Sequence, residues 1–397
     1  LDFATANSSP DKLIGQVVDT ARAALLNLDL SVGGGRQGLI AFVANPTGAL
    51  KGYYQAFQTM LQPEGQAIHL AMNASRYEWW AQRGLTLNMS PLDITIGLKG
   101  TRKQLLDRVP ILAQFNNAQF NTIMRPLKLS VAEAHLATLQ AVRDAKGLAG
   151  VAQSFPIIGK AVKRFAGKIG AMSDDELASV ASDAANNWVG GIEWSRIMTG
   201  RPSTIRRLVI LTEGWTRARV GNIINLPKLS PEGVLARRMM TQEMAILMGV
   251  AAAANIVMNG KLPREFFDIR STNFGVIEAP WGFVRLMPHA VELRTVARFL
   301  AGTPQDALSL TKRAQAPLQF FEGRLGQFPR VTADLIRGKD FFGRDIDNKA
   351  LYVLREFIPI VSGSVWEDLE SRDPRSAVAA RSGLEFAGFT TWPAGVT

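Results

Sequence analysis

Apolar residues recur at intervals of three and four along most of this 397-residue chain, and that spacing places them on one face of an α-helix. Glycine, proline and polar turn residues separate the periodic stretches, as they do between helices. The pattern predicts a mainly α fold, either an elongated multi-helix assembly or a bundle. We expect helices over 14–28, 38–60 with a break at Asn45-Pro46, 67–84, 102–124, 131–144, 201–211, 233–258, 289–301, 305–321, 330–336, 349–359 and 364–370.

Capping residues predict where two of the helices begin. Ser173 precedes three consecutive carboxylates, which supplies an N-cap side chain and negative charge at the positive end of the helix dipole. Ser130 followed by Glu133 has the spacing of a capping box. We therefore expect one helix to begin after Ser173 and another to begin at 131.

One stretch departs from helical spacing. Residues 272–286 hold two short runs of strand-forming residues on either side of a turn at 278–282, which predicts one small β-hairpin. Because a two-stranded hairpin is not stable alone, we expect it to pack against helices. The last residues, 379–397, predict an irregular tail that lies on another surface.

These elements divide the chain into three regions. Residues 1–32 are expected to form an N-terminal helix or linker, and 33–172 an N-terminal helical region. Residues 173–397 are expected to form a C-terminal helical region that carries the hairpin and the tail. The chain begins with Leu1 rather than methionine, so we interpret it as a segment of a longer protein.

The stretch 186–219 combines amides, a glycine pair, tryptophans and spaced arginines. Glycines allow helix backbones to approach closely, and large aromatic side chains anchor such contacts. We therefore predict that this stretch locks helices together. The expected packing or interface residues are Asn186, Asn187, Gly190, Gly191, Trp194 and Trp215.

The chain carries 45 lysines and arginines against 34 aspartates and glutamates, a formal net charge of +11. This surplus favours an anionic partner, either nucleic acid or a membrane surface, although a soluble basic protein without such a partner has the same composition. The candidate DNA- or anion-binding residues are Lys160, Lys163, Arg164, Arg217, Arg219, Arg237 and Arg238.

Two segments bear on membrane contact. A helix over 155–170 would collect basic residues on one half and apolar residues on the other, which is typical either of a helix on an anionic membrane or of a solvated surface helix. Residues 244–258 carry no charge, but crossing a bilayer takes about 20 apolar residues. We therefore expect a buried core helix there, unless several copies insert together.

The sequence offers no pattern for catalysis, cofactor binding or metal coordination. The absence of cysteine excludes disulfides, thiolate chemistry and cysteine-bound zinc within this chain. His135 has no partner at helical spacing and is interpreted as structural. Gly33-Gly34-Gly35 lacks the lysine and hydroxyl residue of a phosphate-binding loop and is interpreted as a hinge. We expect a protein that is not an enzyme.

Three blocks of sequence share an order and a spacing with one known family. The first reads NNWVGGIEWSRI from Asn186 and continues as RRLVILTEGWTRARVGNII from Arg206. The second is 268–277, and the third is 324–343, which ends in a Gly-Lys-Asp-Phe turn. Together they resemble a region of the large polyvalent proteins of tailed bacteriophages. The resemblance covers about residues 30–370 and is stronger after 180.

The resemblance implies an internal or ejection-type protein inside or on the phage particle, which reaches the host envelope on infection. It implies other virion proteins as partners, a homo-oligomer, and no catalytic residue in this region. The leading hypothesis is a non-enzymatic structural protein that acts in particle assembly and genome ejection, with nonspecific DNA contact. Two alternatives remain open: a membrane-active module that perforates the host envelope during DNA entry, and a non-catalytic region of a longer chain whose enzyme domain lies elsewhere.

Overall fold

The computed structural model describes residues 35–61, 71–87, 122–144, 167–189, 213–303, 313–317, 334–339, 345–349, 352, 375–386 and 390–392. These residues are mainly helical, with one small antiparallel sheet, which confirms the predicted fold class. The helices are α2 (Arg36–Ala44), α3 (Pro46–Leu61), α5 (Ala74–Gln82), α8 (Met124–Asp144), α11 (Asp174–Val189), α14 (Glu213–Asn225), α15 (Pro231–Asn259), α16 (Ala290–Ala301) and α21 (Arg375–Phe386). The strands are β1 (Val276–Ala279), β2 (Gly282–Arg285) and β3 (Thr390–Trp392).

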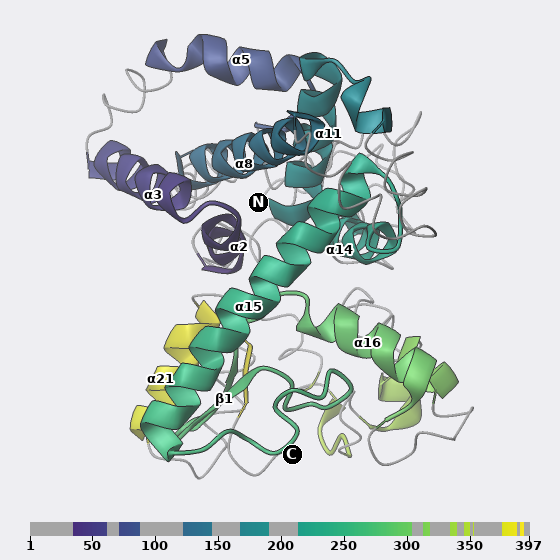
Figure 1. The fold of residues 1–397 in the computed structure, drawn as a ribbon. Coiled ribbons are helices and arrows are strands. Elements are labelled where there is room, and N and C mark those ends of the chain that lie inside the picture. The colour runs from purple at the N-terminus through teal and green to yellow at the C-terminus, as the bar shows by residue number, and fades with distance from the viewer. Residues whose placement is uncertain are drawn as a thin grey trace, which may run out of the picture.

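Helix α15 joins two groups of elements (Figure 1). Helices α2, α3, α5, α8 and α11 lie toward its first half, whereas the sheet, α16 and α21 lie around its second half. The main hydrophobic core extends through both groups, from Ile40 and Trp188 to Phe274 and Met287. The two groups therefore share one core across the long helix.

The ends of α15 follow from its sequence. The Ser230 hydroxyl accepts a hydrogen bond from the N–H of Gly233 at 3.3 Å, and Pro231 occupies the first turn. Proline has no backbone N–H, and at this position an N–H would have no partner within the helix in any case. Gly260 ends the helix with a φ of 66°, a left-handed conformation that glycine adopts without strain. The predicted helix over 233–258 is confirmed with slightly wider bounds.

Helix α8 begins earlier than its sequence predicted. A start at 131 is wrong, because α8 begins at 124 and carries Pro126 in its first turn, where proline is tolerated. Ser130 lies inside the helix and donates its hydroxyl to a carbonyl one turn back at 2.8 Å. Glu133 accepts a hydrogen bond from Nε of Arg76 on α5 at 2.8 Å. The apparent capping pair therefore serves other contacts.

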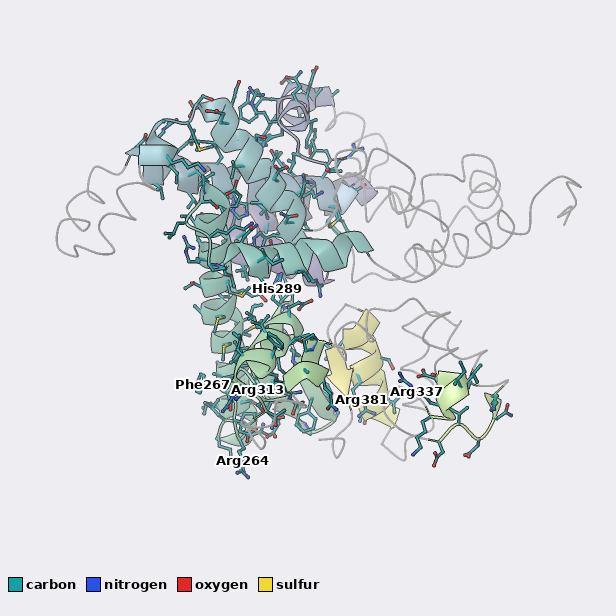
Figure 2. The ribbon with its side chains drawn as sticks, turned by 90° about the vertical axis from the view of Figure 1, so that its right-hand side faces the viewer. Arg264, Phe267, His289, Arg313, Arg337 and Arg381 are labelled. Atoms are coloured by element: carbon teal, nitrogen blue, oxygen red, sulfur yellow. The ribbon has the colours of Figure 1, made fainter. Side chains whose placement is uncertain are left out.

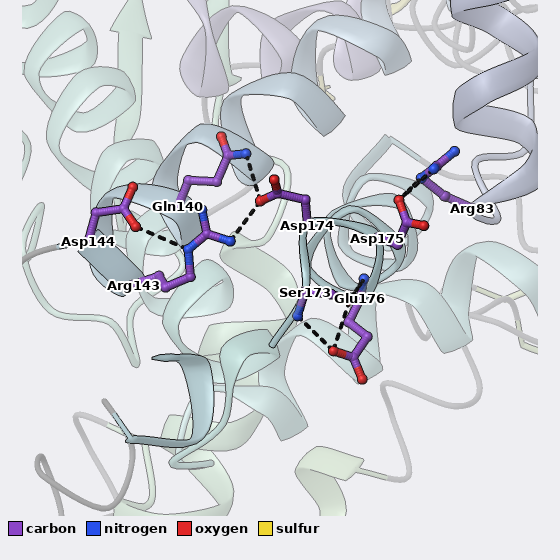
Figure 3. Close-up of polar contacts among 8 residues, drawn as sticks. All are labelled: Arg83, Gln140, Arg143, Asp144, Ser173, Asp174, Asp175 and Glu176. Atoms are coloured by element: carbon purple, nitrogen blue, oxygen red, sulfur yellow. Dashed lines mark hydrogen bonds and ion pairs between the residues drawn. The ribbon is translucent and has the colours of Figure 1, made fainter. Parts of the chain in front are cut away.

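The helix start predicted at Ser173 is confirmed (Figure 3). The backbone N–H of Ser173 donates to Oε2 of Glu176 at 2.8 Å, and the N–H of Glu176 donates to the Ser173 hydroxyl at 3.3 Å. This is a reciprocal capping box. The neighbouring carboxylates tie α11 to α8 and to the end of α5 through the pairs Asp174–Arg143, at 2.7 Å, and Asp175–Arg83, at 2.9 Å.

The predicted break between two helices at Asn45-Pro46 is also confirmed. Oδ1 of Asn45 accepts a hydrogen bond from the N–H of Gly48 at 3.0 Å and so satisfies a donor in the first turn of α3. Its Nδ2 donates to the Ser130 carbonyl at 3.3 Å. The side-chain amide of Asn45 therefore caps α3 and contacts α8.

The predicted hairpin is confirmed as β1 and β2, which pair antiparallel with Ile277 opposite Val284. Asn255 of α15 holds its outer edge. Nδ2 of Asn255 donates to the Val276 carbonyl at 2.8 Å, and its Oδ1 accepts from the N–H of Glu278 at 2.8 Å. The hairpin thus packs on a helix, as its small size requires.

The end of the chain differs from its prediction. Residues 375–386 form α21, and β3 pairs antiparallel with β2, with Thr391 opposite Val284. An irregular tail from 379 is therefore wrong for the described part. The pairing partner of β3 lies more than a hundred residues earlier in the chain, so local sequence carries no signal for it.

Candidate polyanion-binding site

Several predicted site residues lie outside the described residues: Lys160, Lys163, Arg164, Gly190, Gly191 and Trp194. Arg217 and Trp215 lie in α14, but their side chains are outside the described part. The remaining candidates all have described side chains. They are Arg219, Arg237, Arg238, Asn186 and Asn187.

The three described arginines of the predicted anion-binding set bind acceptors within the protein. Arg219 is buried, and its NH1 lies 3.4 Å from Oε1 of Glu292. NH1 of Arg237 donates to two carbonyls at the end of α14 and just after it, at 2.7 and 2.8 Å. NH1 of Arg238 donates to the Ala134 carbonyl of α8 at 3.0 Å. These guanidinium groups join helices to one another.

The amide of Asn186 crosses from α11 to the segment that follows α5. Nδ2 of Asn186 donates to the Gly84 carbonyl at 2.8 Å, and its Oδ1 accepts from the N–H of Thr86 at 3.0 Å. Asn187 contributes its backbone carbonyl, which accepts from Nδ2 of Asn222 at 3.4 Å. The two asparagines therefore lie at contacts between elements, where packing residues were expected.

A buried polar junction joins α15, α14, α11 and the start of α16. Glu243 accepts from the backbone N–H of His289 at 2.9 Å and contacts His289 Nδ1 at 2.7 Å. Nε2 of His289 lies 3.4 Å from Nδ2 of Asn222, and Trp188 packs edge-on against the imidazole ring. A proton on Nδ1 lets the carboxylate accept it and leaves Nε2 as an acceptor for the amide.

The residues of this junction connect helices and are not exposed to solvent. His289 is fully buried, and Glu243 and Asn222 are buried with it, so a solute has no route to the imidazole within the described part. Sequence reasoning missed it, because the members are separated by 46 and 67 positions. A single histidine and a single glutamate in different helices give no local motif.

A second group of polar side chains gathers three arginines, which we call the arginine cluster: Arg285 of β2 and Arg294 and Arg298 of α16. NH2 of Arg285 donates to the Thr272 carbonyl at 2.5 Å, and Nε of Arg298 donates to the Arg270 carbonyl at 2.6 Å. Two guanidinium groups therefore converge on one short loop. Arg294 lies one helical turn before Arg298, so it is on the same side of α16.

The carboxylates near the arginine cluster bind other cations. Asp268 accepts from Nε and NH2 of Arg270 at 3.0 and 2.9 Å. Glu292 faces Arg219. Glu292 also attracts Arg294, and Asp268 also attracts Arg298. Among the described residues, the three guanidinium groups of the cluster therefore share two carboxylates that also pair with Arg270 and Arg219.

Burial, together with repulsion between the guanidinium groups, lowers the pKa values of these arginines. Burial, followed by repulsion from Arg294 and Arg298, lowers the pKa of Arg285 to about 9. Burial and repulsion from Arg298 lower the pKa of Arg294 to about 10, against an opposing effect of Glu292. All three remain charged near neutral pH. A bound anion would relieve the repulsion that these shifts record.

The arginine cluster is partly accessible to solvent on the side of α16. Arg285 is buried, whereas Arg294 and Arg298 are half-buried. Guanidinium groups are planar donors that match the oxygens of phosphate and sulfate. The sequence held one signal for this site, the two arginines four residues apart on one helix face, a spacing that is unfavourable unless something compensates it.

Comparisons with protein-family models, curated proteins and solved structures found no match. The chemistry of the arginine cluster is therefore inferred from its geometry. Its donors are cationic, face one loop and reach the surface through α16. That arrangement favours an anion with several oxygens, and a phosphate of a nucleic-acid backbone is one such group.

Proposed function

We propose that this chain is a structural protein of a bacteriophage particle, a segment of a larger protein, that acts in particle assembly and genome ejection without catalysing a reaction. The observation that carries the proposal is the arginine cluster, in which three guanidinium groups lie near one another on β2 and α16. The phage setting rests on the resemblance of the three sequence blocks. A homo-oligomer with other virion proteins as neighbours is part of the proposal.

The use of polar side chains elsewhere supports a scaffold. Lys128 of α8 is fully buried and donates its Nζ to the Thr86 carbonyl at 2.8 Å. Nε of Arg125 donates to the Leu87 carbonyl at 3.2 Å. With Asn186 these side chains fasten one short segment to two helices. Buried donors with satisfied acceptors favour one rigid arrangement, which suits a protein that must assemble in copies.

In this proposal the arginine cluster contacts the phosphates of DNA. Phosphate contacts position a protein on the duplex and carry no sequence information. Each phosphate that a guanidinium neutralises releases counterions, so affinity falls steeply with salt concentration. Nonspecific, salt-sensitive binding is what a passing genome requires, because a tight sequence-specific site would retain it.

Analysis of purified phage particles tests whether this chain is a particle protein. Quantitative mass spectrometry of purified particles should find this chain in a fixed number of copies per particle, greater than one. Particles emptied by triggered ejection should lose or rearrange it, because an ejection protein leaves its original place with the DNA. Abundance in infected cells together with absence from purified particles would contradict the proposal.

A further inference from the structure

The second half of α15 exposes an apolar face. Val250, Ile256 and Val257 have exposed fractions of 50%, 52% and 85%. The stretch 244–260 has no charged residue. Its two asparagines, at 255 and 259, donate to backbone carbonyls of β1. The outward surface of these turns is therefore apolar, and apolar surface of this extent usually has a partner.

A strained turn a few residues after α15 exposes an aromatic side chain. Glu265 has a φ of 61°, the sole positive value among the described non-glycine residues. Its carbonyl accepts from the N–H of Asp268 at 2.9 Å, and its carboxylate accepts from the Ser271 hydroxyl at 2.8 Å. The turn buries Phe266 and leaves Phe267 68% exposed. Strain of this kind persists where the surroundings enforce it, and it is frequent at functional sites.

Two exposed cations precede the aromatic side chain in the sequence. Lys261 and Arg264 are exposed, and the carboxylate of Glu265 points inward to Ser271, so it does not neutralise them. In Figure 2, Arg264 lies at the lower end of the second group of elements and Phe267 at its left edge, and both lie below His289. Exposed apolar side chains and two exposed cations therefore occur together in the stretch 257–267, which we call the apolar tip.

We propose that this tip, made of Val257, Met258, Lys261, Arg264 and Phe267, docks on the surface of an anionic lipid bilayer. A bilayer accepts exposed apolar side chains at the level of its headgroups, and the exposed Lys261 and Arg264 gain from anionic lipid. The proposal does not depend on the phage setting or on DNA binding by the arginine cluster.

The contacts of α15 favour docking on the bilayer surface over crossing the bilayer. By length and composition α15 is the one helix within the described ranges that could cross a membrane. However, Arg237 donates to a carbonyl just after α14, Arg238 donates to a carbonyl of α8, and Glu243 binds His289. Inserting the first half of α15 would break these buried contacts. The tip reaches the bilayer while those contacts stay intact.

The absence of native cysteine allows a direct test in the full chain. Phe267→Cys carries an environment-sensitive fluorophore, and Phe299→Cys, at a comparably exposed position of α16, is the matched control. Added phosphatidylglycerol vesicles should shift the emission of the label at 267 to shorter wavelength and leave the label at 299 unchanged. Phosphatidylcholine vesicles should give a much weaker response. Equal shifts at both positions, or none at 267, would overturn the proposal.

Vesicle co-sedimentation of unlabelled protein supplies a second measurement. Phe267→Ser should weaken binding about tenfold or more, because a buried phenylalanine contributes about that factor to a partition constant. The Lys261→Gln/Arg264→Gln double variant should weaken binding to anionic vesicles alone, whereas Phe299→Ser should bind as the unmodified chain does. Binding that ignores Phe267→Ser overturns the proposal. So does self-association that Phe267→Ser abolishes without any vesicle binding, which would assign the tip to a second copy.

Discussion

The carboxylate of Glu243 holds both the backbone N–H and the imidazole of His289, at 2.9 and 2.7 Å. His289 is the residue before α16, so this pair fixes the position of the first turn of α16 against α15. The arginine cluster lies partly on α16. The junction therefore positions the candidate site without contacting its ligand.

Removing this carboxylate should destabilise the fold. Glu243→Ala leaves two buried donors of His289 without an acceptor, and we expect a loss of about 3 kcal/mol in the free energy of unfolding. Glu243→Gln keeps a carbonyl acceptor and should lose less. Urea denaturation measures both, with Glu232→Gln at the more exposed start of α15 as the control. A loss from Glu243→Ala no larger than that of the control would contradict the assigned role.

His135 should make stability depend on pH. Burial and repulsion from Arg238 lower the pKa of His135 to about 3, from an ordinary 6.5. Between those values the unfolded chain binds a proton that the folded chain does not. Stability attributable to His135 is therefore complete above the unfolded pKa and declines as pH falls, by at most about 1.4 kcal/mol per pH unit.

The comparison with His135→Leu isolates this effect. Neither ring nitrogen has a hydrogen-bond partner within the described residues, so the apolar variant should be at least as stable at pH 7. Between pH 6 and 4.5 it should lose less stability than the unmodified chain. Parallel urea midpoints of the two proteins across this interval would show that His135 is not buried as described.

Asn186 should be far more sensitive to substitution than its neighbour. Asn186→Ala removes a donor to Gly84 and an acceptor for Thr86, and leaving such groups unsatisfied costs about 2 kcal/mol. Asn187→Ala removes a half-buried side chain and keeps the carbonyl that Asn222 uses. Thermal unfolding of the two variants compares them. Equal losses would remove the distinction between the two amides.

The arginine cluster should lower the stability of the fold in the absence of a bound anion and should bind anions. Arg294→Gln removes a charge that repels Arg285 and Arg298, so the variant should be as stable as the unmodified chain or more so in chloride. Sulfate should raise the melting temperature of the unmodified chain beyond its general effect. The general effect is the rise that Arg294→Gln shows at the same ionic strength. Identical sulfate responses would contradict an anion site at this cluster.

The parts of the fold that local sequence determines were predictable. The break at Asn45-Pro46, the helix start at Ser173 and the hairpin at 276–285 each have their decisive residues within a few positions. Such signals act through caps, turns and strand periodicity. They are visible before any tertiary contact is known.

The rest depends on partners that are distant in the chain. Ser130 and Glu133 have the spacing of a cap, but Glu133 binds Arg76, 57 residues away. Arg238 looked like a surface cation, but it donates to a carbonyl 104 residues away. The sequence shows that a cationic side chain is present, but it does not show which hydrogen-bond acceptor that side chain contacts. The arginine cluster was missed for the same reason, since Arg285 and Arg298 both bind carbonyls of the loop at 270–272, which lies apart from both in the chain.

The most direct test of DNA binding by the arginine cluster is the salt dependence of binding to a random-sequence DNA duplex. The unmodified chain should bind with an affinity that falls steeply with salt, independent of sequence. The Arg294→Gln/Arg298→Gln variant should weaken binding and reduce the slope by roughly one per lost phosphate contact. Arg76→Gln, which alters an exposed ion pair elsewhere, should change neither. Absent binding by the unmodified chain, or an equal loss in Arg76→Gln, would contradict the proposal that the arginine cluster faces DNA.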